Sequence, residues 1–251
     1  MNLIDVKNLL FNYKIYSGEK EEVIEHTAID HVSLSIKKGD FVGILGHNGS
    51  GKSTLAKIIM GIEKPSQGTI LFKGQDITNL DIHERAKLGM GFAFQQPVRF
   101  KGLTVRDLLH LSTSKQKSDQ ELSQYLTEVG LNASNYINRE INASLSGGEL
   151  KRIEIAMLMA RGVDLSLFDE PEAGIDLWSF HNLIKVFEQI RDTKRGAVVI
   201  ISHQERILNI ADKIVVISNG EIDTVGTRDE ILPKLLSQSD TYQFHKVREQ
   251  Q

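Results

Sequence analysis

The sequence predicts an α/β fold organised around a phosphate-binding loop, and three observations indicate it. Residues 46–54 read GHNGSGKST and match the pattern G-x-x-x-x-G-K-[ST] of a P-loop. The apolar run from Phe41 to Leu45 leads into this loop and is typical of a buried strand. Leu55, Ile58 and Ile59 follow the loop at helical spacing. The motif therefore lies between a strand and a helix, which is the context that phosphate binding requires.

The composition limits the class of protein. The chain has 251 residues, of which 40 % are apolar, and a formal net charge of −3, which suits one large domain with no broad nucleic-acid or membrane-binding patch. It has no cysteine, which excludes disulfides and thiolate metal sites. No apolar run approaches the ~18 residues that span a bilayer, and the N-terminus lacks the pattern of a signal peptide. We therefore expect a cytoplasmic protein.

Before residue 97, apolar runs alternate with polar breaks. The charged stretch from Glu19 to Glu22 is typical of an exposed loop. The pattern predicts strands at residues 3–10, 29–36, 41–45, 69–72 and 90–94, a helix after the P-loop, and a short helix at about residues 81–88.

Residues 97–146 differ in character from the strands before them. From Thr104 to about Tyr136 the pattern is mostly helical, with polar breaks between Ser112 and Ser118. We interpret residues 97–146 as a helical insertion in a nucleotide-binding α/β core that comprises residues 1–96 and 147–251.

The last third of the chain returns to alternating strands and helices. Residues 145–149, here called the LSGGE segment, open a helix, and a short strand at 165–168 leads to Asp169 and Glu170. The pattern then predicts a helix from residue 177, a strand at 198–201, a hairpin of residues 214–217 and 221–225 joined by Asn219-Gly220, and a helix from about residue 228.

The P-loop sequence indicates a site for a nucleotide and Mg²⁺. Its glycines let backbone N–H groups approach an anion, and the following helix adds free N–H groups and a positive dipole end. Lys52 would reach the β- and γ-phosphates, and the Ser53 hydroxyl would ligate Mg²⁺. The predicted nucleotide-binding residues of the loop are Gly46, His47, Asn48, Gly49, Ser50, Gly51, Lys52, Ser53 and Thr54.

Five motifs stand in order along the chain: GHNGSGKST, Phe94-Gln95, the LSGGE segment, LFDE at residues 167–170, and His203. With this ordered set the chain resembles the ATP-binding-cassette (ABC) ATPases over nearly its whole length. The resemblance implies an α/β fold with a P-loop NTPase core of ABC type, an antiparallel β subdomain and an inserted α-helical subdomain. It also implies that the protein hydrolyses MgATP, a reaction catalysed largely by positioning and charge stabilisation.

The resemblance assigns roles to the strand-end residues. Glu170 resembles the general base that polarises the attacking water, and Asp169 would support the Mg²⁺ shell. His203 matches the histidine that senses the γ-phosphate. Gln95 would contact Mg²⁺ or the attacking water, with Gln96 as the alternative if the register differs by one. An Asp-Glu pair at a strand end can also cap a helix, and the other histidines show no spacing of metal ligands.

The LSGGE segment has two interpretations that are compatible. Ser146 and Glu149 before an apolar helix form a capping box, which the glutamine of many family members would also satisfy. The same helix N-terminus, with Gly147 and Gly148, can accept a γ-phosphate. In the family this segment meets ATP bound by the other subunit, so the resemblance implies a homodimer or paired cassette in the ATP-bound state. Asp176 matches the loop that crosses this interface.

The residue that stacks on adenine is less sharply indicated. The family places an aromatic ring ahead of the P-loop, and Tyr13 fits this place, with Tyr16 as the alternative. Both tyrosines can also be ordinary core or rim residues. We expect Trp178 to pack rather than to bind nucleotide.

Short segments bear on what the ATPase drives. Residues 93–98, 146–152 and 202–208 resemble the Suf-type iron–sulfur cluster assembly ATPases, which implies soluble Suf-type scaffold proteins as partners. Residues 41–57 instead resemble the ATPases of energy-coupling-factor importers, and Pro171 is common in transporters. The alternative is therefore a membrane permease as partner, with the chain peripheral to the membrane. Nucleic-acid cassettes usually carry coiled-coil or zinc insertions, which this sequence lacks, so we expect no nucleic-acid partner.

Overall fold

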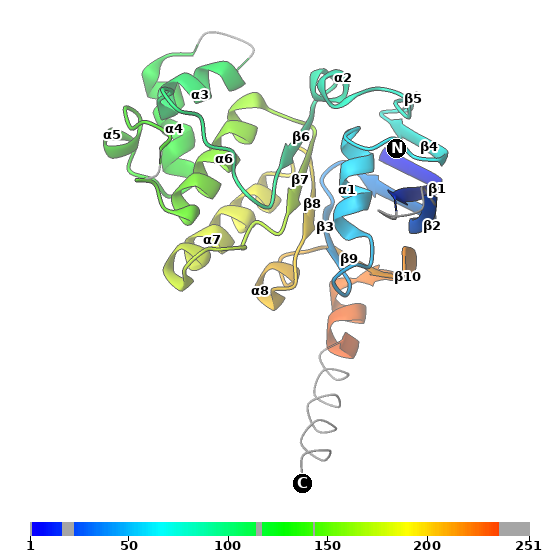
Figure 1. The fold of residues 1–251 in the computed structure, drawn as a ribbon. Helices are drawn as coiled ribbons and strands as arrows, with labels where there is room; N and C mark the ends of the chain where they lie inside the picture. Colours follow the sequence, from blue (N-terminus) through cyan, green and yellow to red (C-terminus); the bar gives the residue numbers. More distant parts are fainter. Residues whose placement is uncertain (1, 17–22, 114–116, 143, 236–251) are drawn as a thin grey trace.

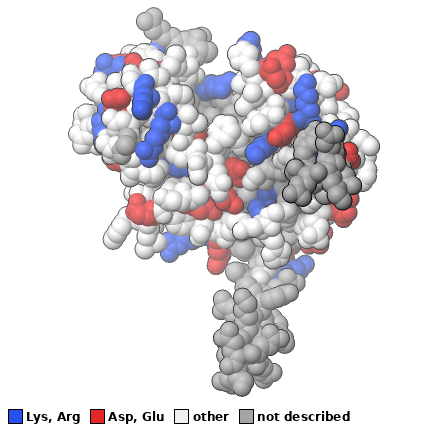
Figure 2. Space-filling view, viewed as in Figure 1, with Lys and Arg blue, Asp and Glu red and all other residues white. Residues whose placement is uncertain are grey.

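A computed structural model describes residues 2–16, 23–113, 117–142 and 144–235. The exposed loop expected at residues 19–22 lies outside them. Within these residues two β-sheets and a layer of helices make up the fold, and none of the helices combines the length and apolar character needed to cross a membrane. On the face drawn in Figure 2, acidic and basic side chains are interspersed, which agrees with the small net charge.

The central sheet has six strands in the order β10-β9-β3-β8-β7-β6. Their bounds are β3 Phe41–Leu45, β6 Met90–Ala93, β7 Leu165–Asp169, β8 Ala197–Ile201, β9 Lys213–Ser218 and β10 Glu221–Thr227. All neighbours are parallel except β9 and β10, which form the predicted antiparallel hairpin. Asn219 and Gly220 at its tip have φ of +50° and +84°, as a type I′ turn requires.

The second sheet is antiparallel, with strand order β2-β1-β4-β5. Its strands are β1 Asn2–Tyr16, β2 Val23–Lys37, β4 Gln67–Phe72 and β5 Gln75–Asp76. The first strand is longer than the predicted 3–10, because β1 continues its pairing with β2 as far as Tyr16 opposite Val23. Several register shifts between the two strands interrupt the alternation of apolar residues, and this hides the extra length from a periodicity argument.

Most helices lie where the apolar periodicity predicts them. Their bounds are α1 Lys52–Met60, α2 Ile82–Lys87, α3 Val105–Ser112, α4 Asp119–Glu128, α5 Ala133–Tyr136, α6 Gly147–Arg161, α7 Leu177–Thr193 and α8 Glu205–Leu208, and residues 228–235 are also helical. Within the mostly helical stretch after Thr104 the structure places α3, α4 and α5, and the break between α3 and α4 includes residues outside the described part. In Figure 1, α6 and α7 lie on one side of the central sheet with α3 to α5 packed beyond α6, and α1 with the antiparallel sheet lies on the other side.

The pleat of the central strands divides the core into two clusters. Val198 and Ile200 of β8 point to the cluster that contains α3 to α7, whereas Val199 and Ile201 point to the cluster that contains α1 and the antiparallel sheet. A parallel sheet covered on both faces is exposed only at its ends. The loops at the carboxyl ends of β3, β7 and β8 are therefore the place to look for a site.

The buried Arg85 fixes the far end of the P-loop helix. Its guanidinium donates to the carbonyl oxygens of Ile58 and Ile59 at 2.7 Å each, and to those of Leu80 and Thr78 at 2.9 Å. Burial lowers the pKa of Arg85 to about 10, and Asp76 opposes this shift. The side chain thus satisfies carbonyl groups at the end of α1, in addition to the bond that the Gly61 N–H makes to the Ile58 carbonyl oxygen.

Candidate functional site

The P-loop is shaped so that only glycine fits at two of its positions. A Cβ atom at Gly46 would lie 2.0 Å from the carbonyl oxygen of Ile217, and one at Gly51 would lie 2.4 Å from that of Ala28. Gly51 also has a φ of +101° and immediately precedes α1. The loop therefore packs its backbone against β9 and β2 while it delivers Lys52 to the first position of α1.

Lys52 lies inside the curve of this loop. Its Nζ donates to the carbonyl oxygens of Gly46 and His47 at 2.8 and 3.0 Å. Burial lowers the pKa of Lys52, and the carboxylates of Glu170 and Asp169 oppose that shift. The loop thus holds a partly desolvated cation beside the amides that would face an anion.

Ser53 and Asp169 form a pair of oxygen donors next to the lysine. The Ser53 hydroxyl donates to Asp169 Oδ1 at 3.1 Å, which joins the start of α1 to the end of β7. Burial raises the pKa of Asp169, and the hydrogen bond from Ser53 opposes the shift. A hydroxyl and a carboxylate on rigid elements, open to phosphate and water oxygens, are the donors that Mg²⁺ uses, so these residues fit the ion.

Glu170 follows β7, and two side chains from other segments, Gln95 and His203, contact its carboxylate. Gln95 Nε2 donates to Glu170 Oε2 at 2.5 Å, and His203 Nε2 lies 3.5 Å from Glu170 Oε1. Burial lowers the pKa of His203, with Lys52 acting in the same direction and Glu170 against it. Glu170 itself has a φ of +44°, a conformation that costs free energy for a residue with a side chain and is most often kept where function needs it.

Lys52, Ser53, Gln95, Asp169, Glu170 and His203 are called the P-loop half-site below. Gln95 rather than Gln96 makes the contact with Glu170. None of the described residues forms a cluster of three or more His, Asp and Glu side chains that could hold a metal ion. An ion held here would accordingly depend on Ser53, Asp169, the amide oxygen of Gln95 and the ligand itself.

Glu172 and Ser202 support the half-site, and the sequence did not single them out. The Ser202 hydroxyl donates to Glu172 Oε1 at 2.5 Å, and the backbone N–H of Gln204 donates to Ser202 Oγ at 3.0 Å. Burial raises the pKa of Glu172, and Ser202 opposes the shift. This bridge holds the backbone on both sides of His203. The one sequence signal for it is a carboxylate two residues after Glu170.

Tyr13 lies near the start of the P-loop helix. Its hydroxyl is 3.3 Å from Thr54 Oγ1, and its ring meets the edge of Phe11 with a centroid distance of 4.8 Å. The side chain of Tyr16 lies outside the described part of the chain. Tyr13 is therefore the candidate for adenine that the geometry can place beside the loop.

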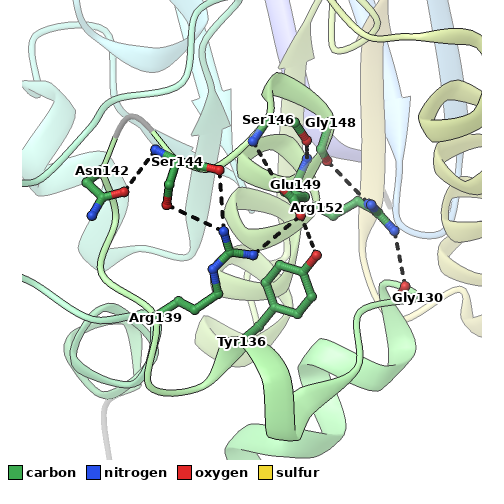
Figure 3. A network of polar contacts seen from close by, with 9 residues as sticks. All are labelled: Gly130, Tyr136, Arg139, Asn142, Ser144, Ser146, Gly148, Glu149 and Arg152. Atoms are coloured by element: carbon green, nitrogen blue, oxygen red, sulfur yellow. Dashed lines mark hydrogen bonds and ion pairs between the residues drawn. The ribbon is translucent and has the colours of Figure 1, made fainter.

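The LSGGE segment is capped by its own side chains and contacted by Tyr136 and Arg139 (Figure 3). Ser146 Oγ accepts the N–H of Glu149 at 3.2 Å, and Glu149 Oε2 accepts the N–H of Ser146 at 2.6 Å, which is the predicted capping box. Glu149 Oε1 accepts the hydroxyl of Tyr136 and lies 3.6 Å from Arg139 Nη1. Burial acts to raise the pKa of Glu149, but the donors outweigh it and the pKa is lowered.

Two arginines extend this network to the neighbouring helices (Figure 3). Arg139 Nη2 reaches the carbonyl oxygen and hydroxyl of Ser144 at 3.3 and 3.4 Å. Arg152 donates to the carbonyl oxygens of Gly148 at 3.3 Å and Gly130 at 3.1 Å. The start of α6 is thus fastened to the ends of α4 and α5.

Asp176 caps α7 beside the LSGGE segment. Its Oδ1 accepts the N–H groups of Trp178 and Ser179 at 3.0 Å each. A Cβ atom at Gly148 would lie 2.5 Å from that of Ser179, so the two helix starts lie side by side. The expectation that Trp178 packs is wrong: the residue is 85 % exposed, because α7 begins at the surface.

The structure thus gathers the predicted residues into two groups. The P-loop half-site is one group, and Ser146, Gly147, Gly148 and Asp176 form the other. Over the described ranges, no hydrogen bond or ion pair joins a residue of one group to a residue of the other. Each group is therefore held together by its own contacts within this chain.

An apolar groove of about 950 Å³ lies beside Gln95. Phe92, Phe94, Val98, Leu108 and Met157 are among the residues that line it, so β6, the segment after it, α3 and α6 all contribute. Phe92 and Phe94 stack edge to face at 4.6 Å. Phe94 and Val98 are 38 % and 53 % exposed, so the groove offers apolar surface to another molecule.

Comparison with known proteins adds a family and named relatives. Residues 29–173 match the family described as ABC transporter. An uncharacterized ABC transporter ATP-binding protein of Methanocaldococcus jannaschii is 38 % identical over 225 residues, covering 86 % of this chain and 87 % of that protein. A probable ATP-dependent transporter, ycf16, of Antithamnion sp. is 32 % identical over 243 residues, covering 90 % and 92 %.

A solved structure agrees over the same length. The dimeric post-hydrolysis structure of the ATP-binding cassette MJ0796, bound to ADP and Pi, is similar with a TM-score of 0.77 and 27 % identity. The similarity covers 90 % of this chain and 98 % of that one.

Proposed function

The chain belongs to the ABC transporter family, and from this we propose that it is the ATP-binding subunit of a membrane transporter. Membership makes it an ATP hydrolase with the ABC ATPase fold. The observation that carries the transport proposal is the apolar groove lined by Phe94. This groove offers a docking surface, and the next residue, Gln95, contacts the proposed catalytic base Glu170. The names of the relatives, which are transporter ATP-binding proteins, support it.

We assign the chemical step to the P-loop half-site. Lys52 and the P-loop N–H groups bind the β- and γ-phosphates of ATP, and Tyr13 stacks on adenine. Glu170 accepts a proton from water as the water oxygen attacks the γ-phosphorus and ADP leaves. His203 donates to the γ-phosphate, and Gln95 orients the water from its place against Glu170.

Ser53 and Asp169 are the residues that would hold Mg²⁺, with the amide oxygen of Gln95 as a further ligand. When bound, the ion offsets the negative charge of the phosphates. The raised pKa of Asp169 fits this role, since a cation beside the buried carboxylate would favour its charged form.

The second group of residues completes the site of another copy. Ser146, Gly147 and Gly148 present helix N–H groups and a hydroxyl that suit a γ-phosphate, and among the described residues no hydrogen bond or ion pair joins them to the P-loop half-site of their own chain. Asp176 lies beside them at the start of α7. We therefore propose a head-to-tail pair with ATP between the copies, and the dimeric relative bound to ADP and Pi supports this arrangement.

The groove is the proposed seat of a helix from the permease. It lies between the core and the proposed helical insertion, residues 97–146, so closure of the two cassettes would shift its walls relative to one another. Phe94 lines the groove, and the next residue, Gln95, contacts Glu170. A helix bound in the groove could therefore change the position of Gln95 against the base.

Iron–sulfur cluster assembly of the Suf type is the second candidate. The segments 93–98, 146–152 and 202–208, which resemble those ATPases, favour it. The same groove would then receive a soluble scaffold protein. The names of the relatives favour transport, and within transport the segment 41–57 favours an importer of the energy-coupling-factor type.

A pull-down separates these candidates. The Glu170→Gln variant is purified with ATP from its own cells, with membrane and soluble fractions kept apart. We expect an integral membrane permease in the membrane fraction. Recovery of a soluble scaffold able to carry a cluster would replace transport by the Suf-type function, and failure to recover a membrane protein under any nucleotide condition would end the transport proposal.

Two further variants make the result specific. Lys52→Ala removes a phosphate ligand and should abolish any ATP-dependent recovery. Val98→Asp places a charge in the groove at an exposed position, so it should abolish recovery of the permease while the isolated cassette keeps its ATPase activity. Retained recovery with Val98→Asp would show that the permease binds elsewhere.

A further inference from the structure

An ion pair is buried in the first turns of α6, on the side that faces β6. Lys151 Nζ lies 3.5 Å from Glu154 Oε2, and the two side chains are 2 % and 18 % exposed. Burying a pair of charges costs desolvation that their attraction rarely exceeds, so stability alone is a poor reason for it. The contacts of the pair indicate what it positions.

Both members of the pair bind the backbone of one residue, Phe94. Lys151 Nζ donates to the carbonyl oxygen of Phe94, and the N–H of Phe94 donates to Glu154 Oε1 at 3.3 Å. Phe94 follows Ala93, the last residue of β6, so neither backbone group belongs to the sheet ladder. Two side chains of α6 thus take the place of a neighbouring strand.

The residue after this grip is Gln95, whose amide lies 2.5 Å from Glu170. Consecutive Cα atoms are about 3.8 Å apart along a rigid peptide, so a shift of the Phe94 backbone displaces Gln95. The Phe94 side chain meanwhile lines the apolar groove. Phe94 therefore joins three things: the groove through its side chain, α6 through its backbone, and the base through its successor.

The electrostatics make the two charges depend on each other. Burial lowers the pKa of Lys151, and Glu154 opposes the shift. Burial raises the pKa of Glu154, and Lys151 opposes that shift. Asp169 and Glu172 also act to raise the pKa of Lys151, more weakly than Glu154 does. Removing one member would leave the other buried and unpaired, so a clean test must change both.

We propose that Lys151 and Glu154 are positioning residues for ATP hydrolysis, which hold the backbone of Phe94 and so set Gln95 against Glu170. The proposal rests on the role assigned to Gln95 above. It also means that the helix carrying the LSGGE segment is fastened directly to the residue before Gln95. In the proposed pair, Gln95 serves the chain's own site and the LSGGE segment serves the site of the other copy, so the two sites would be coupled through this contact.

The test is a double-mutant cycle on steady-state ATP hydrolysis. The variant Lys151→Met/Glu154→Leu replaces the pair by apolar side chains of similar size. In the native background we expect kcat to fall about tenfold to a hundredfold, as misplacement of a catalytic group by about 1 Å can do, with KM for ATP within about twofold. In a Gln95→Ala background the same change should lower kcat by less than about twofold.

A matched control removes another lysine–carboxylate pair. Lys213 lies 2.8 Å from Asp40 at the opposite ends of the strands, and Lys213→Met should leave kcat, KM and the cycle unchanged. If Lys151→Met/Glu154→Leu does not fold, Lys151→Met/Glu154→Gln serves in the same cycle, since it removes both charges and the Lys151 bond to Phe94 while its amide oxygen can still accept the Phe94 N–H.

The outcomes are distinct for the two proposals. Equal loss of kcat with and without Gln95 would overturn the positioning role and leave the role of Gln95 intact. Unchanged kcat in the native background would overturn it as well. Full activity of Gln95→Ala alone would remove Gln95 from the chemistry, and the positioning role would fall with it.

Discussion

Asp169 in the P-loop half-site and Glu149 at the start of α6 are both partly desolvated carboxylates, and their surroundings differ. Asp169 accepts a hydrogen bond from the Ser53 hydroxyl, and burial raises its pKa. Glu149 has donors from Ser146 and Tyr136 with Arg139 alongside, and its pKa is lowered. The half-site is therefore built to gain from an added cation, whereas the LSGGE segment is already neutralised by its own chain.

The backbone shows the same contrast. Glu170 has a φ of +44°, a strained value for its residue type, whereas Ser146 has φ −66° and ψ 160°, the usual geometry of a helix cap. The strained Glu170 and the weakly compensated charge of Asp169 are neighbours at the proposed place of hydrolysis. A relaxed, hydrogen-bonded surface lies where the other copy is expected to arrive. This contrast fits the proposed roles, in which the half-site acts on ATP and the LSGGE segment of the other copy recognises it.

The largest effect should come from Glu170→Gln. The change keeps the shape but removes the base, so kcat should fall by about 10² to 10⁴ while ATP binding is retained and the dimer accumulates. Single-turnover hydrolysis and size-exclusion chromatography with ATP measure both. Glu149→Gln is the same chemical change in the other region and should leave kcat within about threefold. Unchanged hydrolysis with Glu170→Gln would remove Glu170 as the base.

Lys52→Ala should have the next largest effect. The lysine supplies charge-assisted hydrogen bonds to phosphate, so its loss should raise the Kd for ATP roughly 10- to 100-fold. Arg139→Met removes a cation from the other region and should leave the Kd of the isolated subunit unchanged. Titration with a fluorescent ATP analogue compares the two. Tight binding by Lys52→Ala would contradict the role assigned to the P-loop lysine.

A pair of variants at Ser146 separates capping from phosphate recognition. Ser146→Ala removes the cap of α6 and should lower the free energy of unfolding by about 1 kcal/mol in urea titrations. Ser146→Asp caps equally well, so it should keep this stability. Both should lose ATP hydrolysis. The alanine lacks the hydroxyl that would meet the γ-phosphate, and the aspartate would place a negative charge beside it. Normal hydrolysis by Ser146→Asp would mean that the LSGGE segment does not meet the γ-phosphate.

Local signals in the sequence predicted much of this fold. The capping box before α6, the Asn219-Gly220 turn and the P-loop between β3 and α1 all depend on residues close in the chain. The length of β1 and the exposure of Trp178 were not predicted, because bulges break the periodicity and an aromatic residue at a helix start gives no sign of its neighbours.

The parts of the site that sequence reasoning missed are long-range polar pairs. Lys151 and Glu154 read as charges on an amphipathic helix, and their shared backbone partner is Phe94, which the Lys151 bond reaches across 57 residues of sequence. The Ser202–Glu172 bridge likewise joins β8 to the segment after β7 across 30 residues. What distinguishes these side chains from ordinary surface charges is their burial, and burial is set by tertiary packing that the sequence does not show.

The smallest effect should come from Glu149→Gln, and it appears as a pH dependence of stability. Because the folded-state pKa of Glu149 lies below its ordinary value of 4.5, its stabilisation is present above pH 4.5 and is lost as pH falls through the folded pKa. The glutamine variant keeps the capping box but does not titrate. Its free energy of unfolding should therefore lie within about 1 kcal/mol of the native value at pH 7. That difference should shrink as the pH falls below 4.5. A difference that stays constant with pH would mean that Arg139 and Tyr136 do not stabilise the charge of Glu149, and the contrast with Asp169 would then fail.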